Sequence, residues 1–407
     1  MKILHTQVKE VAVLLAIVLL SYVVSLIAPV LSYDFPQLRF YGKYVFVAAL
    51  LSIALLLLLN GRKVRLVPGT TLFCLFVAYF LLHSMIFEQS ASLFGETFGQ
   101  SVILLYLLYA AFYVILRDQS DYLNALRSIW FFLIIALGYY LVLLYQSRGG
   151  ILFSSVRIGS EDVGQTLNSN VLCFQAVIFS IVSLRLYEID LSSSRQKFKK
   201  TDWIWPSLVF LIVLFSLLFS FLHASFTSIF LMCIVLVVAL KVMPLRFKTK
   251  IGLFCIIITI SFLGINVFDE IGMFDQLSLI DERIKEGGST SERSNSLLYV
   301  WSQFEKHPFF GNSADPAVYD GTGSTNHTFY MNILSIYGVF GFILYIFLFT
   351  AILLPGLSSV SSAQLLAGVF LLIVWAVAPT NYFQVIALLV LIPDNRFNNS
   401  RLSQIRI

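Results

Sequence analysis

The feature that most constrains this chain is a series of long, almost uncharged apolar runs. Several approach or exceed the roughly 20 residues that span the hydrocarbon layer of a membrane. Of the 407 residues, 58% are hydrophobic and only 12% are charged, which is too little polar surface for a soluble protein of this size. A helix satisfies its own backbone in lipid, and the runs are too long and unbroken for barrel strands, so we expect helices.

These runs predict an all-α polytopic membrane protein with about eleven or twelve transmembrane helices and a large outer loop that carries short helices. The run 204–240 is too long for one crossing and should fold back near His223–Thr227. The last two runs meet at Ala378–Asn381 as a tight hairpin or a re-entrant pair. The first run lacks a cleavage site and is interpreted as a retained helix. The predicted spans are 11–31, 43–60, 70–87, 100–116, 128–146, 168–185, 204–222, 226–242, 251–268, 328–354, 363–378 and 381–393.

The distribution of Lys and Arg predicts the orientation of these spans. Nineteen of the 27 lie inside if the N-terminus is cytoplasmic, and eight lie outside, which agrees with the positive-inside rule. Arg185 opens one inner segment, 185–203. No Lys, Arg, Asp or Glu occupies the middle of a predicted span, which argues against an ion-coupled transporter. The four cysteines lie in apolar runs and are interpreted as packing residues without a metal or disulfide motif.

Two outer segments are the candidates for chemistry, and they divide the chain. The segment 269–327 is much longer than a connecting turn requires. The expected organisation is 1–146 with five transmembrane helices, 147–167 as a first outer loop, 168–268 with the next four helices, 269–327 as the large outer loop, and 328–407 with the last helices and a cytoplasmic tail.

Most of the outer basic residues lie in these two loops, although the positive-inside rule disfavours basic residues on the outer side. An anionic ligand explains them, and a phosphate is the anion that best matches a forked guanidinium. Arg148, Arg157 and Arg293 are the favoured ligands, and Arg283 is a weaker one. The alternative is that these arginines only pair with neighbouring carboxylates, namely Asp281, Glu282, Glu292, Glu161 and Asp162.

His327 stands at the threshold of an apolar helix, where Asn326 can cap the helix. At helical spacing it shares a face with Met331, Leu334, Gly338 and Gly341, and the glycines would let a neighbouring helix pack closely. The other reading is an ordinary interfacial polar residue. His83, His223 and His307 lack this combination, so His327 is the predicted catalytic histidine.

With these motifs in view, the chain resembles the O-antigen polymerase and O-antigen ligase superfamily, whose fold is similar to that of GT-C-like glycosyltransferases. That family pairs an arginine or a histidine with a glycine about ten residues on, in two periplasmic loops. Here Arg148 and Gly159, and likewise His327 and Gly338, are separated by ten residues. The segment His307–Gly311, "HPFFG", resembles the one preceding the family's histidine.

The resemblance implies a glycosyltransferase in the bacterial inner membrane with its catalytic loops in the periplasm. Its donor would be an undecaprenyl-diphosphate-linked oligosaccharide, and its partners membrane lipid and, as a further candidate, a chain-length regulator protein, but no nucleic acid. We expect no cofactor, because arginines can stabilise the diphosphate leaving group without a metal. His327 would deprotonate the acceptor hydroxyl and invert the anomeric centre, with Glu161, Asp162 and Glu292 as reserve bases.

Three functions stay open. Polymerase is favoured over ligase because ligases of this superfamily carry a Ser-Arg pair at the turn between the middle helices, whereas Phe226 follows Ser225 here. A lipid-glycan transporter is more remote, since the chain shows no internal repeat. After Arg293, the spacing of Ser296, Val300 and Phe304 predicts an amphipathic helix on the membrane surface. Aromatic residues nearby could stack on sugars or anchor at the interface, namely Tyr299, Trp301, Tyr319 and Phe329.

Overall fold

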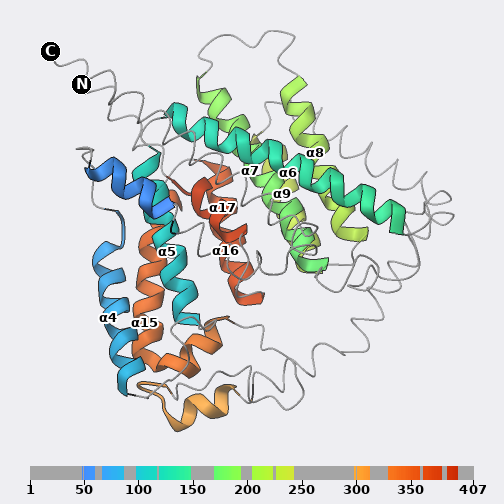
Figure 1. The fold of residues 1–407 in the computed structure, drawn as a ribbon. Helices are drawn as coiled ribbons and strands as arrows, with labels where there is room; N and C mark the ends of the chain where they lie inside the picture. The colour runs from blue at the N-terminus through green and yellow to red at the C-terminus, as the bar shows by residue number, and fades with distance from the viewer. Residues whose placement is uncertain are drawn as a thin grey trace.

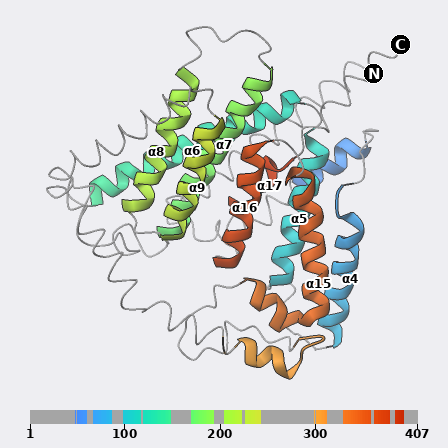
Figure 2. The same cartoon turned by 180° about the vertical axis from the view of Figure 1, so that it is seen from behind.

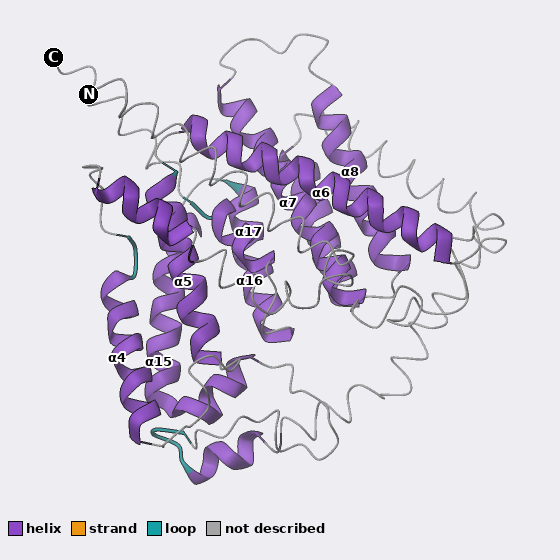
Figure 3. Ribbon diagram, in the orientation of Figure 1, coloured by secondary structure: helices purple, strands orange, loops and turns teal. Residues whose placement is uncertain are grey.

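The computed structural model describes the helical part of the chain. The described residues are 48, 50–59, 67–86, 98–116, 119–147, 169–193, 204–222, 226–242, 298, 300–311, 329–357, 361–377 and 383–392. Within these ranges the chain forms α-helices and short turns, without a strand (Figure 3). The all-α prediction is therefore confirmed for this part of the protein.

The described helices follow the predicted apolar runs, except that the helix Gln119–Ser147 begins well before the predicted span 128–146 and the helix Ser169–Ser193 extends beyond its predicted end. Their bounds are Leu50–Leu59, α4 (Thr70–Ile86), α5 (Phe98–Ile115), α6 (Gln119–Ser147), α7 (Ser169–Ser193), α8 (Ile204–Leu222), α9 (Phe226–Val242), α15 (Phe329–Leu357), α16 (Ser362–Val377) and α17 (Phe383–Val390). A further short helix covers 300–306. The predicted spans 11–31 and 251–268 lie outside the described residues.

Two described helices are long and apolar enough to cross a membrane. They are Gln119–Gly138 within α6 and Tyr330–Pro355 within α15. Several shorter apolar helices accompany them, among them Thr70–Ile86 and Thr227–Val242. Large apolar side chains also remain exposed on the outer faces of the helices, including Leu59 at 75%, Met85 at 77% and Val237 at 68%. Such surfaces are costly in water and typical of contact with an apolar partner.

The fold-back between the middle helices lies where it was predicted. α8 ends at Leu222 and α9 begins at Phe226. α7 differs from expectation, because it continues two turns beyond the predicted span and ends at Ser193. Arg185, predicted at the edge of an aqueous segment, is thus helical, and only 1% of its surface is exposed.

The helices form two neighbouring groups that α16 and α17 connect. α4, α5 and α15 lie side by side, while α7, α8 and α9 pack together and α6 crosses them obliquely (Figures 1 and 2). Both α16 and α17 contact α7. Phe174 and Phe370 meet edge to face at 6.0 Å between ring centroids, which is a favourable aromatic geometry. This packing brings together helices that are far apart in the sequence.

Candidate functional site

The most distinctive local feature is a break in α15 at Gly338. The backbone there has φ 66° and ψ −170°, which is not helical, so this single residue divides α15 into two helical halves. A positive φ is accessible to glycine without the steric penalty that a side chain brings. Figure 1 shows the resulting change of direction near the lower end of α15, beside the short helix 300–306.

The break frees backbone groups, and the segment 307–311 satisfies some of them. In a regular helix, the N–H groups of Val339 and Phe340 would bond to carbonyls four residues earlier. Here the Val339 N–H donates to the Pro308 carbonyl at 2.9 Å, and the Phe340 N–H donates to the Phe309 carbonyl at 3.4 Å. The "HPFFG" segment is therefore docked on α15 through its backbone.

Two side chains of α4 complete the broken turn. The Tyr79 hydroxyl donates to the Tyr337 carbonyl at 2.6 Å and is also hydrogen-bonded to the Gly341 backbone. This hydroxyl thus bridges the two groups that an unbroken helix would join directly. One turn away, His83 Nε2 lies 2.7 Å from the Phe310 carbonyl. α4, α15 and the outer segment therefore share one polar junction, which we call the outer junction (Tyr79, His83, 307–311 and 336–341).

Glycines make this close approach possible. A Cβ at Gly338 would lie 2.3 Å from the Phe309 carbonyl oxygen, and one at Gly311 would lie 2.2 Å from the Ile336 carbonyl oxygen. A Cβ at Gly341 would lie 2.9 Å from the Tyr79 ring. Since backbone atoms cannot move aside as a flexible side chain can, Gly311 and Gly338 are required for the junction.

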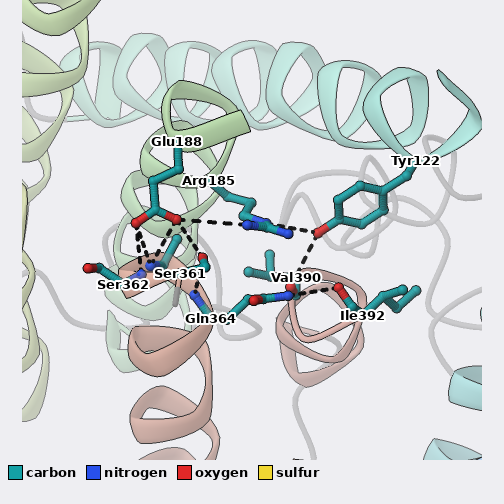
Figure 4. Close-up of polar contacts among 9 residues, drawn as sticks. Tyr122, Arg185, Glu188, Ser361, Ser362, Gln364, Val390 and Ile392 are labelled. Carbon is teal, nitrogen blue, oxygen red and sulfur yellow. Dashed lines mark hydrogen bonds and ion pairs between the residues drawn. The ribbon is translucent and has the colours of Figure 1, made fainter. Parts of the chain in front are cut away.

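A second polar cluster, the inner cluster, joins α6, α7, α16 and α17 (Figure 4). Glu188 of α7 accepts hydrogen bonds from the Ser362 N–H at 2.8 Å, the Ala363 N–H at 3.3 Å and the Ser361 hydroxyl at 2.5 Å. These N–H groups open α16, where a carboxylate is favoured by the helix dipole. Glu188 is therefore a cap supplied by a different helix.

Buried Arg185 extends this cluster. Its guanidinium lies 3.8 Å from the Glu188 carboxylate and donates from Nε to the Tyr122 hydroxyl at 3.2 Å. The Tyr122 hydroxyl in turn donates to the Val390 carbonyl at 3.2 Å. Gln364 donates to the Ile392 carbonyl at 2.7 Å. Figure 4 shows these contacts as one connected network at the end of α16 and α17.

Most of the predicted site residues lie outside the described residues, and their arrangement stays a prediction. These are Arg148, Arg157, Gly159, Glu161, Asp162, Arg283, Glu292, Arg293, Asn326 and His327. Gly338 is described, and its close neighbour is the Phe309 backbone in the turn 307–311, whereas the prediction was a neighbouring helix. The predicted continuous face through Gly338 and Gly341 is wrong, because the backbone at Gly338 is not helical.

The amphipathic helix predicted after Arg293 is present in its described part, 300–306. Val300 is 1% exposed and Trp301 is 44% exposed, so the helix has an inner and an outer face. The Trp301 indole N–H donates to Glu305 at 2.7 Å within the same helix.

Sequence reasoning missed Tyr79, His83 and Glu188. His83 lacks the helix-capping neighbour and the glycine face that favour His327, although Tyr79 and His83 are two polar-tipped residues four apart in an apolar run. Residues four apart lie next to each other on a helix, so this spacing could have indicated that Tyr79 and His83 act together. Glu188 was assigned to an aqueous segment, and the spacing of three from Arg185 was the corresponding signal.

The comparisons with known proteins leave the function to be argued from these contacts. No model of a known protein family matches the chain, and no curated protein matches its sequence. Among the described residues, no group of three or more His, Cys, Asp or Glu is placed to hold a metal ion.

Proposed function

We propose that this protein is an O-antigen polymerase of the bacterial inner membrane. It would be a polytopic, metal-independent, inverting glycosyltransferase that joins undecaprenyl-diphosphate-linked repeat units at the periplasmic face. O-antigen ligase, which transfers the glycan to lipid A-core, is the nearest alternative.

The observation that carries the proposal is the docking of "HPFFG" on α15. The Pro308 and Phe309 carbonyls bond to α15 immediately after the break. His327 lies between this segment and the start of α15 in sequence. The segment 307–311 and the helix that follows His327 are thus tied together, which a site shared between loop and helix needs.

The two polar clusters agree with the predicted orientation of the spans. The inner cluster joins α6, α7, α16 and α17 at ends that the Lys and Arg distribution assigns to the cytoplasm. The outer junction joins α4 and α15 to the segment 307–311, which the same distribution assigns to the other side, although Tyr79 and Gly338 lie inside the predicted spans and not at their ends. The helix ends in the inner cluster share one predicted orientation, which supports a polytopic arrangement.

The proposed chemistry divides the work between a base and cationic ligands. His327 would take the proton of the acceptor hydroxyl as it attacks the anomeric carbon. Arg148, Arg157 and Arg293, with Arg283 as a weaker member, would stabilise the charge that builds on the departing diphosphate. The bond to the diphosphate breaks as the new glycosidic bond forms, and the base carries away the proton.

The lipopolysaccharide of a deletion strain tests this function. A lost polymerase leaves a single repeat unit on lipid A-core, whereas a lost ligase leaves none. Complementation with His327→Ala should restore protein to the membrane but not long glycan chains. Long chains at normal abundance with His327→Ala would remove this histidine from the mechanism, and unaltered banding in the deletion strain would reject the function.

A transporter is the second candidate, because broken helices are a mark of that class. The break at Gly338 favours it. However, transporters aim the freed backbone groups of a broken helix at substrate, whereas the Val339 and Phe340 N–H groups here bond to the Pro308 and Phe309 carbonyls. A lipid-glycan transporter also predicts that deletion removes the lipid-linked repeat unit from the periplasmic leaflet, while polymerase loss leaves it there.

A further inference from the structure

We propose that Tyr79 and His83 are positioning residues for the transfer reaction: by holding the Tyr337 and Phe310 carbonyls, they set the direction of the half-helix 329–337. This inference rests on the proposed function, and it assigns a role to a helix that the sequence motifs leave out. The Tyr79 hydroxyl and the His83 ring hydrogen-bond to main-chain carbonyls. They act through the backbone of α15 and of the outer segment.

Tyr79 and His83 can act together because they lie one turn apart on the same face of α4. Their ring centroids are 5.9 Å apart, and the His83 ring meets the Tyr337 ring edge-on at 5.1 Å. Tyr79 holds the carbonyl just before the break, and His83 holds the carbonyl of the docked segment. Together they fix both partners of the junction to α4.

The chemistry of the histidine contact is defined by its partner. A carbonyl oxygen only accepts hydrogen bonds, so His83 Nε2 must carry the proton that it shares with Phe310. The His83 side chain is 2% exposed, so water has little access to replace this contact if the ring is removed. Glutamine keeps a side-chain N–H donor and can restore the bond, whereas alanine cannot.

The position of the break explains why small errors there should affect catalysis. Nine residues separate Gly338 from Phe329, a length of about 14 Å at the helical rise of roughly 1.5 Å per residue. A rotation of about 10° at the break would move the start of this half-helix by about 2 Å. Misplacement of a reacting group by about 1 Å can lower a rate by roughly 100-fold.

The experiment measures transfer by the purified full-length protein from a lipid-linked repeat unit, with kcat expressed per folded, monodisperse molecule. His83→Ala should lower kcat by about 10- to 100-fold with little change in KM, and His83→Gln should recover a large part of that loss. Tyr79→Phe keeps the ring but lacks the hydroxyl and should lower kcat about 10-fold. It remains informative if His83→Ala does not fold.

Ser84→Ala is the matched control. Ser84 lies beside His83 on α4, but among the described residues its hydroxyl bonds within the helix, to the Phe80 carbonyl at 2.8 Å, so kcat should not change. Wild-type kcat in both His83→Ala and Tyr79→Phe would overturn the proposal, as would loss of folded protein without any change in kcat. Absence of transfer by the wild-type protein is a separate result, and it would reject the proposed function itself.

Discussion

The outer junction and the inner cluster hold helices together by opposite means. At the outer junction, backbone meets backbone, and the contact exists because Gly311 and Gly338 have no side chains. At the inner cluster, long side chains span the gaps between helices, with Arg185 and Glu188 at the centre. The outer junction therefore depends on the absence of side chains at two glycines, whereas the inner cluster depends on a pair of charged side chains.

This difference separates two kinds of sensitivity. A buried ion pair is costly to disrupt, because removing one partner leaves the other charge in a medium that solvates it poorly. A backbone junction is sensitive to added volume and to changes of dihedral angle. We therefore expect the inner cluster to control stability and the outer junction to control geometry.

Glu188→Ala should have the largest effect on stability. It removes the carboxylate beside buried Arg185 and the acceptor for the first N–H groups of α16. The loss of one partner from a buried pair costs about 3–5 kcal/mol. Unfolding of the detergent-solubilised protein and its accumulation in membranes measure the effect.

Glu305→Ala is the control for that variant, because Glu305 is exposed and bonds to Trp301 within its own helix. Its effect should stay within about 0.5 kcal/mol. Equal stability of the two variants would mean that the inner cluster contributes no more than a surface contact.

Gly338→Ala should undock the "HPFFG" segment. A positive φ costs a non-glycine residue about 1–3 kcal/mol, and the new Cβ would also collide with the Phe309 carbonyl. We expect reduced stability together with loss of glycan transfer. The unfolding transition and the glycan product of the variant test both parts.

Gly138→Ala provides the matched comparison, since this helical glycine of α6 has no neighbour within 4 Å of the added Cβ. It should be neutral or stabilising by about 0.5–1 kcal/mol. If the two glycine variants behave alike, the break in α15 is not a constraint on the fold.

Tyr122 in the inner cluster and Tyr79 at the outer junction allow a direct comparison, because each hydroxyl donates to a backbone carbonyl. Tyr122→Phe removes a hydroxyl that also accepts from Arg185, and it should cost about 1.5–3 kcal/mol without altering kcat. Tyr79→Phe removes a bond between neutral groups and should cost about 0.5–1.5 kcal/mol while lowering kcat. A larger kcat change in Tyr122→Phe than in Tyr79→Phe would reverse our assignment of the two ends.

Ser361→Ala should have the smallest effect. The Ser361 hydroxyl accepts from the Gln364 N–H at 3.2 Å, as an N-cap does, and losing a cap costs about 1 kcal/mol. Glu188 still holds the next two N–H groups of α16 in this variant. An effect on unfolding as large as that of Glu188→Ala would show that the serine, and not the carboxylate, organises the helix start.

Individual helices and residues show how much of the structure the sequence predicts. The bounds of α8 and α9 were predictable from hydropathy, because each helix forms within one uninterrupted apolar run. The non-helical conformation of Gly338 and its contact with the turn 307–311 were not predictable, since the surrounding residues continue the helical pattern. The burial of Arg185 was not predictable either, because charge alone places such a residue in water.

By itself, the sequence determined the all-helical character of the described part and the two helices long enough to cross a membrane, because hydropathy and backbone satisfaction act within a segment. Only the tertiary structure decided which polar groups meet. His83 and Phe310 are 227 residues apart, Tyr79 and Tyr337 are 258 apart, and Tyr122 and Val390 are 268 apart. Such pairs form because backbone groups freed at a helix break or a helix end must find partners in a low-dielectric interior, and the packing of the helices determines which partners are within reach.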